Sequence, residues 1–155
     1  MQPLEIELAD LAATEALAQR LAPLLRRGDV IALGGDLGAG KTAFSRGLIR
    51  AFGQPELEVP SPTFTLVQIY DLPTFELWHF DLYRLESPED ALELDIEEAF
   101  ATSVSLIEWP DRLGPYLPAN RLDIRFAFGE SPSMRRVTIE GFGDWLARMA
   151  LLRDV

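Results

Sequence analysis

A glycine-rich stretch, "GGDLGAGKT" at residues 34–42, restricts the fold of this 155-residue chain more than any other feature of its sequence. From Gly35 to Thr42 it fits the pattern Gly-x-x-x-x-Gly-Lys-Thr, in which glycines let the main chain curl until successive N–H groups point at phosphate oxygens. It follows an apolar run, residues 29–34, that is typical of a buried strand, and it leads into a helical spacing of apolar residues over 41–53. A strand, this loop and a helix in that order predict an α/β fold that binds nucleotide phosphates.

Lys41 lies at the end of this pattern and is the only lysine of the chain, since the other 13 of its 14 basic residues are arginines. A flexible stem and a compact ammonium suit a position between the β- and γ-phosphates, where a planar guanidinium is bulkier. We expect Thr42 to place its hydroxyl on Mg²⁺. A glycine-rich turn that matches the pattern by chance is the alternative. If the loop does bind ATP, the phosphates are expected to contact its residues Asp36, Leu37, Gly38, Ala39 and Gly40.

Two acidic residues are candidates for the metal and the attacking water, because a phosphate loop of this kind needs a carboxylate to hold the water shell of Mg²⁺. Glu108 ends the apolar run at 104–108, and a charge at the end of a buried strand needs a partner or a function. Asp81 lies in "HFDLYRL" at residues 79–85. A surface ion pair with Arg84 is the alternative for Asp81. We predict that both acids are catalytic and contact the metal.

Three further side chains are candidates, each with a purely structural alternative. Thr63, in "SPTF", could sense the γ-phosphate or could be a plain turn residue. Trp109 could stack on a base, although a large aromatic residue more often packs in a core. His79, the only histidine, could carry a proton, but a hydrogen-bonded structural histidine is the default interpretation.

The rest of the sequence alternates between strand and helix patterns. Pro23 interrupts a helical spacing that Gly28 closes, and it should kink or restart that helix. Ser87 and Pro88 have the residue types of a helix start. One domain over residues 1–155 is expected, a P-loop NTPase-like three-layer α/β fold whose mixed parallel and antiparallel central sheet is flanked by helices. The expected strands cover residues 4–8, 29–34, 61–70, 75–85, 104–109, 121–128 and 135–142, and a last helix covers 144–152.

Composition excludes several kinds of function. The chain has no cysteine, so disulfides, zinc–thiolate sites and thiol nucleophiles are impossible. Its 25 acidic and 14 basic residues give a net charge of −11, which argues against strong direct binding of tRNA, because affinity for nucleic acid comes mainly from clustered Lys and Arg. A targeting pattern and a membrane-length apolar run are both absent from the sequence, so we expect a soluble, cytoplasmic protein that does not contact a membrane.

Four blocks, "GDLGAGKT", "SPTFTLVQIY", "HFDLYRL" and "IEWPDRL", follow one another along the chain. Together they resemble the TsaE (YjeE) family of bacterial ATPases, and only the first block is shared with P-loop proteins in general. The resemblance extends from Thr14 to Leu113, and no family block follows Gly114. Asp95 stands where family members usually have glycine, a departure that concerns a helix turn and not the site.

This resemblance implies an ATP- and Mg²⁺-dependent ATPase required for threonylcarbamoyl modification of the adenosine 3′ to the anticodon in tRNAs that read ANN codons. It further implies that hydrolysis, weak in the isolated protein and stimulated by partners, resets a TsaB–TsaD heterodimer that carries out the transfer. By block matching, Lys41 and Thr42 contact phosphate and metal, while Asp81 and Glu108 form the metal and water site. The nucleotide would also contact Thr63, Trp109 and, near its base, Thr14.

Three rival functions differ from this expectation. "DRLG" at 111–114 and "NRLD" at 120–123 imitate GTPase motifs, but the few residues between them cannot hold the strand and helix that normally separate such motifs. A small-molecule kinase shares the loop and the size, but it usually needs an arginine-bearing lid that the sequence does not clearly supply. A regulatory subunit that binds ATP without hydrolysing it is the non-enzymatic alternative.

Overall fold

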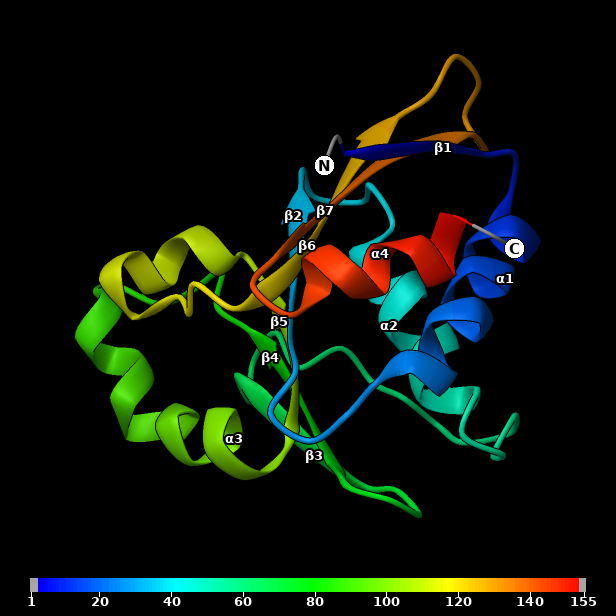
Figure 1. The fold of residues 1–155 in the computed structure, drawn as a ribbon. Coiled ribbons are helices and arrows are strands. Elements are labelled where there is room, and N and C mark those ends of the chain that lie inside the picture. The colour runs from blue at the N-terminus through cyan, green and yellow to red at the C-terminus, as the bar shows by residue number, and fades with distance from the viewer. Residues whose placement is uncertain (1–2, 154–155) are drawn as a thin grey trace.

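The computed structural model describes residues 3–153 and centres on a seven-stranded sheet with the order β1-β7-β6-β2-β5-β4-β3 (Figure 1). β2 pairs in parallel with β5 and β6, and β4 pairs in parallel with β5. The pairs β1–β7, β6–β7 and β3–β4 are antiparallel. The predicted mixed sheet, parallel around the glycine loop, is therefore confirmed. Its strands are β1 (Leu4–Leu8), β2 (Val30–Gly35), β3 (Val67–Asp71), β4 (Glu76–Asp81), β5 (Val104–Glu108), β6 (Arg121–Phe128) and β7 (Arg135–Phe142).

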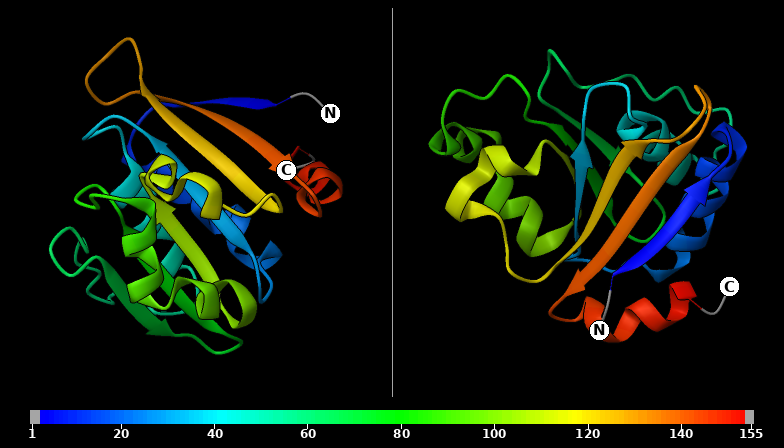
Figure 2. Two further views of the ribbon diagram at one scale, coloured as in Figure 1. Left: turned by 90° about the vertical axis from the view of Figure 1, so that its left-hand side faces the viewer. Right: turned by 90° about the horizontal axis from the view of Figure 1, so that it is seen from above.

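Helices cover both faces of the sheet and give the predicted three layers (Figures 1 and 2). α1 (Leu11–Leu21), α2 (Lys41–Arg50) and α4 (Trp145–Arg153) lie on one face. α3 (Ile96–Thr102) lies on the other, together with the 3₁₀ helices η2 (Pro88–Leu94) and η3 (Pro110–Tyr116). Among the described residues, no helix has the length and apolar character that crossing a bilayer requires.

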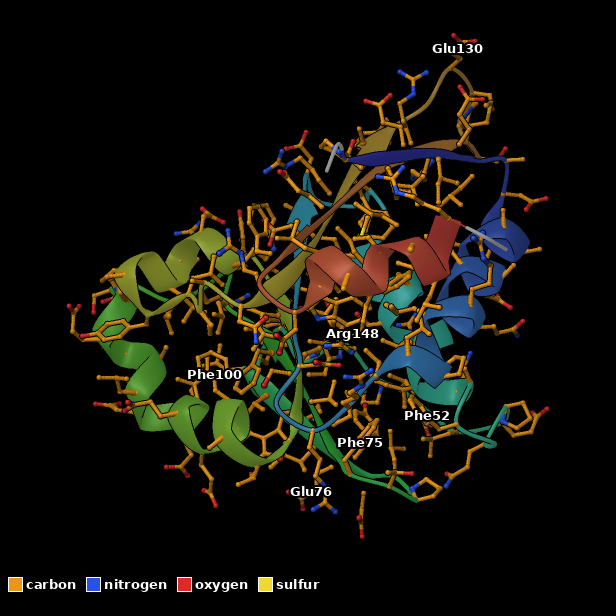
Figure 3. All side chains as sticks on the ribbon, viewed as in Figure 1. Phe52, Phe75, Glu76, Phe100, Glu130 and Arg148 are labelled. Carbon is orange, nitrogen blue, oxygen red and sulfur yellow. The ribbon has the colours of Figure 1, made fainter. Side chains whose placement is uncertain are left out.

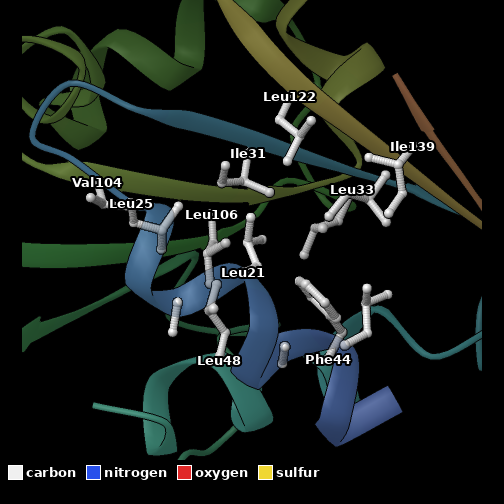
Figure 4. Packing of buried hydrophobic residues seen from close by; sticks show 14 of the residues in the cluster. Leu21, Leu25, Ile31, Leu33, Phe44, Leu48, Val104, Leu106, Leu122 and Ile139 are labelled. Carbon is white, nitrogen blue, oxygen red and sulfur yellow. The ribbon is translucent and has the colours of Figure 1, made fainter. Parts of the chain in front are cut away.

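The larger core lies between the sheet and the first group of helices (Figure 4). Ile31 and Leu33 of β2 and Leu106 of β5 are fully buried there, as are Phe44 and Leu48 of α2. Val30 and Ala32, which alternate with them along β2, are also buried, and Val30 belongs to the second core on the opposite face, which explains the unbroken apolar run of this central parallel strand. Packing on both faces fixes the end of β2, and thereby the start of the glycine loop.

Arg148 connects α4 to the start of β2 through a buried ion pair (Figure 3). Its guanidinium donates to both carboxylate oxygens of Asp29 and to the carbonyl oxygen of Leu24, and it lies 3.7 Å from the ring centroid of Trp145. Bidentate geometry and the added carbonyl contact satisfy charges that would otherwise be costly to bury. The C-terminal helix thus helps to hold the strand that leads into the glycine loop.

Of two predictions about helices, the restart at Pro23 is confirmed and the helix from Ser87 is only partly correct. α1 ends at Leu21 and a 3₁₀ helix, η1 (Ala22–Leu24), follows with Pro23 in its first turn, so the predicted restart is confirmed. The helix expected from Ser87 does begin there, with a capping box between Ser87 and Asp90. It is not continuous, however, because Asp95 has a φ of 59° and divides it into η2 and α3. Asp95, which stands where family members usually have glycine, thus adopts a left-handed conformation, and Asp tolerates this conformation better than most residues.

The β-rich pattern from residue 61 was wrong in extent, because the strand begins only at Val67. Pro62 has no N–H to donate to a ladder, and Leu66 has a φ of 70°, which is outside the extended region. The main chain instead turns, with the N–H of Leu66 donating to the carbonyl oxygen of Pro62. This turn carries Thr63 towards the end of β4 instead of along the sheet edge.

Candidate nucleotide and metal site

The glycine loop joins the end of β2 to the first residue of α2, as its sequence predicts. Gly35, Gly38 and Gly40 have φ values of 128°, 79° and 118°, a region that favours glycine. At Gly35 a Cβ would lie only 2.4 Å from the main-chain oxygen of Phe126 on the neighbouring strand, so no side chain fits. Gly40 caps α2 without a side-chain hydrogen bond. The first N–H groups of this helix therefore remain available to an anion at its positive end.

A hollow of about 280 Å³ opens beside this loop and is where most of the predicted residues meet. It brings together loop, helix and strand-end residues that are up to 72 positions apart in the sequence, from Leu37 to Trp109. Its single positively charged side chain is that of Lys41, and its two acids are Asp81 and Glu108. The lining residues are Leu37, Gly38, Gly40, Lys41, Thr42, Ala43, Ser61, Thr63, Asp81, Glu108 and Trp109.

Parallel pairing of β4 and β5 places the two acids side by side, because Asp81 and Glu108 are register partners at the carboxyl ends of these strands. Glu108 is only 2% exposed, and the hydroxyl of Thr42 donates to its Oε1 at 3.1 Å. Asp81 accepts hydrogen bonds from the hydroxyl of Thr63 at 3.0 Å and from the main-chain N–H of Tyr83 at 3.1 Å. The pair of carboxylates at the ends of β4 and β5 is thus contacted by Thr42 of α2 and by Thr63 of the turn before β3.

The surface ion pair considered for Asp81 does not form. Asp81 is 6% exposed, and its partners are Thr63 and Tyr83. The guanidinium of Arg84 instead lies 4.4 Å from the ring centroid of Phe64. Asp81 is therefore a buried acid held by two neutral donors, and among residues 3–153 no cation lies within hydrogen-bond reach of its carboxylate.

Lys41 is folded back on its own loop and is 4% exposed. Its ammonium donates to the carbonyl oxygen of Gly35 and lies 3.6 Å from the ring centroid of Trp109. Burial lowers the pKa of Lys41, and the nearby acids, first Glu108 and then Asp81, oppose that shift. Trp109, with a φ of 59°, also has its ring 4.9 Å from that of Tyr83. The ring of Trp109 thus packs against Lys41 and Tyr83 and also lines the hollow, and stacking on a base stays a prediction.

Thr14 is separate from the acids. It is buried on α1 and lines a second hollow of about 210 Å³, which adjoins the first through Gly40 and Ala43. Arg135 lines this second hollow too, and its guanidinium donates to the carbonyl oxygen of Gly38 at 3.3 Å. Sequence reasoning missed Arg135, because an arginine in an alternating strand is typical of an exposed sheet surface and no local pattern links it to the loop.

These oxygen ligands fit Mg²⁺ that is bound together with a nucleotide. In residues 3–153 no cluster of three or more His, Cys, Asp or Glu side chains could hold a metal ion unaided. Mg²⁺ is usually held by one or two carboxylates, and phosphate oxygens and water complete its shell. Asp81 and Glu108 are two adjacent carboxylates, and the hydroxyl of Thr42, in contact with Glu108, lies beside them.

The three-layer fold and the glycine loop between a central parallel strand and a helix define the class, that of P-loop NTPase-like α/β proteins. The chain belongs to the TsaE family within that class. The family sequence model described as "Threonylcarbamoyl adenosine biosynthesis protein TsaE" matches residues 8–137. The family resemblance expected from the four blocks is thereby confirmed.

Individual relatives agree with this assignment. The tRNA threonylcarbamoyladenosine biosynthesis protein TsaE of Rickettsia bellii is 40% identical over 111 residues, which cover 72% of this chain and 77% of the relative. The protein of that name from Synechocystis is 42% identical over 120 residues, 75% of each chain. The crystal structure of Bacillus subtilis YdiB superimposes with a TM-score of 0.79 at 30% identity, covering 99% of this chain and 96% of YdiB. The chain is thus a member of a family that serves tRNA threonylcarbamoyladenosine biosynthesis.

Proposed function

We propose that the protein is a cytoplasmic, Mg²⁺-dependent ATPase whose hydrolysis cycle resets a TsaB–TsaD heterodimer during threonylcarbamoylation of tRNA. The observation that carries this proposal is the meeting, in one hollow, of the glycine loop, Lys41, and the hydrogen-bonded pair Thr42 and Glu108. These groups have the chemistry that a nucleoside triphosphate and its metal require.

Each residue has a role in this proposal. The ammonium of Lys41 leaves the carbonyl oxygen of Gly35 and pairs with phosphate oxygens, which compensates its charge better than neutral carbonyls do. The hydroxyl of Thr42 and the acids Asp81 and Glu108 would hold Mg²⁺, with one of the two acids orienting the attacking water. Mg²⁺, when bound, offsets the negative charge of the phosphates.

Partner dependence is supported by what lines the hollow. Lys41 is its only cation, and no arginine is among the lining residues to stabilise charge on the transferring phosphoryl group. We therefore expect slow hydrolysis by the protein alone and faster hydrolysis when TsaB–TsaD completes the site. A net charge of −11 supports the view that these partners, and not this chain, hold the tRNA.

ATP is favoured over GTP because both residues that imitate a guanine-reading motif are engaged elsewhere. Asn120 exchanges hydrogen bonds with Asp144 at the turn before α4, and Asp123 is paired with Arg121. Neither side chain belongs to the hollow beside the loop. A competition experiment should accordingly show displacement of bound ATP by ADP but not by GDP.

The decisive experiment measures Mg²⁺-dependent ATP binding by calorimetry and ATP turnover with and without TsaB–TsaD. Lys41→Met should weaken binding by about 10–100-fold, the value of one charge-assisted contact of about 1.5–3 kcal/mol. Glu108→Gln should still bind ATP, although with a weaker dependence on Mg²⁺, and should lose turnover. Glu97→Gln, at an exposed acid of α3 on the opposite face of the sheet, should match wild type.

Other results would contradict the proposal. Full tRNA modification over many cycles by Glu108→Gln would favour a regulatory subunit that only binds ATP. Phosphorylation of a metabolite without any effect of TsaB–TsaD would favour a kinase. Wild-type protein that is folded but takes up no ATP would overturn the nucleotide site itself.

A further inference from the structure

We propose that His79 is a positioning residue for the Mg²⁺·ATP site, in which its imidazole holds the Glu108 carboxylate in place beside Thr42. This inference rests on the proposed function. It refines the default sequence-based interpretation, a hydrogen-bonded structural histidine, because the ring is buried, contacts Glu108 and does not line the hollow in which it could carry a proton.

The position of His79 within the sheet makes this role specific. His79 is fully buried in β4, two residues before Asp81, so both side chains project from the same face of the sheet. Leu77, two residues earlier still, belongs to the apolar core under α2. A polar ring in this apolar layer requires a hydrogen bond to offset the cost of its burial.

The single hydrogen bond of the ring goes to the acid. Nε2 of His79 lies 2.6 Å from Oε2 of Glu108. Because a carboxylate only accepts hydrogen bonds, Nε2 must carry the proton, which defines the tautomer. Nδ1 has no partner among the described residues. The contact with Glu108 is therefore the one hydrogen bond that the described residues offer this ring.

This contact anchors one oxygen of the carboxylate. Oε2 accepts from His79, and the hydroxyl of Thr42 lies within hydrogen-bond distance of both oxygens, 3.1 Å from Oε1 and 3.3 Å from Oε2. A carboxylate with one oxygen anchored cannot rotate freely about its last bond. The hydroxyl of Thr42 could offer a lone pair to a metal and still donate its proton to Glu108, so His79 would be the second donor that holds this carboxylate. Partners of this kind, one step behind a metal ligand, typically contribute 10- to 100-fold in metal affinity or activity.

The test compares substitutions that keep or remove the donor. His79→Leu has a similar volume but no donor, whereas His79→Gln places an amide N–H near the position of Nε2. Ser105→Ala is the matched control, because Ser105 is a fully buried polar residue of β5 whose hydroxyl has no hydrogen-bond partner in the described structure. The measurements are Mn²⁺ binding to the ADP complex by electron paramagnetic resonance, ADP binding in EDTA, and the kcat and KM of Mg²⁺·ATP hydrolysis.

Positioning predicts that His79→Leu weakens Mn²⁺ binding by about 10–100-fold and lowers kcat, with metal-free ADP binding unchanged. His79→Gln should recover most of the Mn²⁺ affinity, and Ser105→Ala should match wild type in every measurement. A merely structural histidine would alter thermal unfolding and ADP binding together and would leave the metal affinity of the folded protein unchanged.

Three results would overturn the inference or its basis. A folded His79→Leu protein with wild-type Mn²⁺ affinity overturns the positioning role alone. If His79→Leu does not fold, His79→Asn replaces it, since its shorter amide cannot reach Glu108; equal Mn²⁺ affinities of the Asn and Gln variants then overturn the role. Wild-type protein whose ADP complex binds no Mn²⁺ overturns the proposed function, and the positioning role with it.

Discussion

Substituting Gly35 by alanine should destabilise the protein more than the same change at any unrestrained glycine. Its φ of 128° costs an L-residue about 1–3 kcal/mol. The added Cβ would also lie 2.4 Å from the main-chain oxygen of Phe126, which is its register partner in the parallel β2–β6 pair. Neither atom can move without disturbing that ladder, so overpacking adds about 1–3 kcal/mol. Together the two effects predict a loss of about 2–6 kcal/mol.

Gly53 supplies the matched control. Its φ is 96°, yet an added Cβ would meet no atom within 4 Å, so Gly53→Ala should lose only the conformational part, about 1–3 kcal/mol. Urea unfolding of both variants, followed by tryptophan fluorescence, measures the two losses under the same conditions. The reasoning is refuted if Gly35→Ala loses no more stability than Gly53→Ala, because the clash with Phe126 would then have no energetic consequence.

Three further changes are informative. Arg148→Met should lower the free energy of unfolding by about 3–5 kcal/mol, because it leaves the buried Asp29 carboxylate without its cation. In a double-mutant cycle with Asp29→Asn, the double variant should lose less stability than the two single variants together, and additive losses would contradict this. Burial raises the pKa of Tyr70 above 10.0, so its stabilising contribution is complete below that pH and is lost as the pH rises through the folded-state pKa. The free energy of unfolding of Tyr70→Phe, measured in urea, should therefore rise relative to that of wild type as the pH becomes alkaline. A difference between the two proteins that stays constant across pH would argue against this. Asp95→Gly should be nearly neutral in thermal unfolding, whereas Asp95→Val should lose about 1–2 kcal/mol at its left-handed position; equal melting temperatures would contradict this.

Local conformational preference explains which elements could be predicted. Glycines at fixed offsets before Lys41 specify a curled main chain whatever surrounds it. The restart at Pro23 follows equally directly from the missing N–H of proline. The strand expected from residue 61 was too long, because β propensity at Phe64 and Thr65 does not register the turn that Pro62 and Leu66 impose. Propensity describes single residues, whereas a turn depends on the geometry of several together.

In the candidate site, too, some features could be predicted from local sequence and others could not. Lys41 and Thr42 could be predicted from the loop pattern, Glu108 from its place at the end of an apolar run, and Asp81 from the block "HFDLYRL" in which it lies. The contacts of Glu108 with Thr42, 66 residues away, and with His79 could not be assigned, since no local pattern encodes them. They depend on β4, β5 and β2 being neighbours in the sheet and on the register that aligns Asp81 with Glu108.

The sequence alone therefore determined the glycine loop, the α/β class and the family, because these depend on residue types at short, fixed separations. Only the tertiary structure decided that His79 anchors an acid, that Arg135 reaches the loop, that Thr14 lies in an adjoining hollow and that Asp81 pairs with Thr63 instead of Arg84. Strand order and register bring these side chains together, and both are set by the burial of apolar surface across the whole sheet.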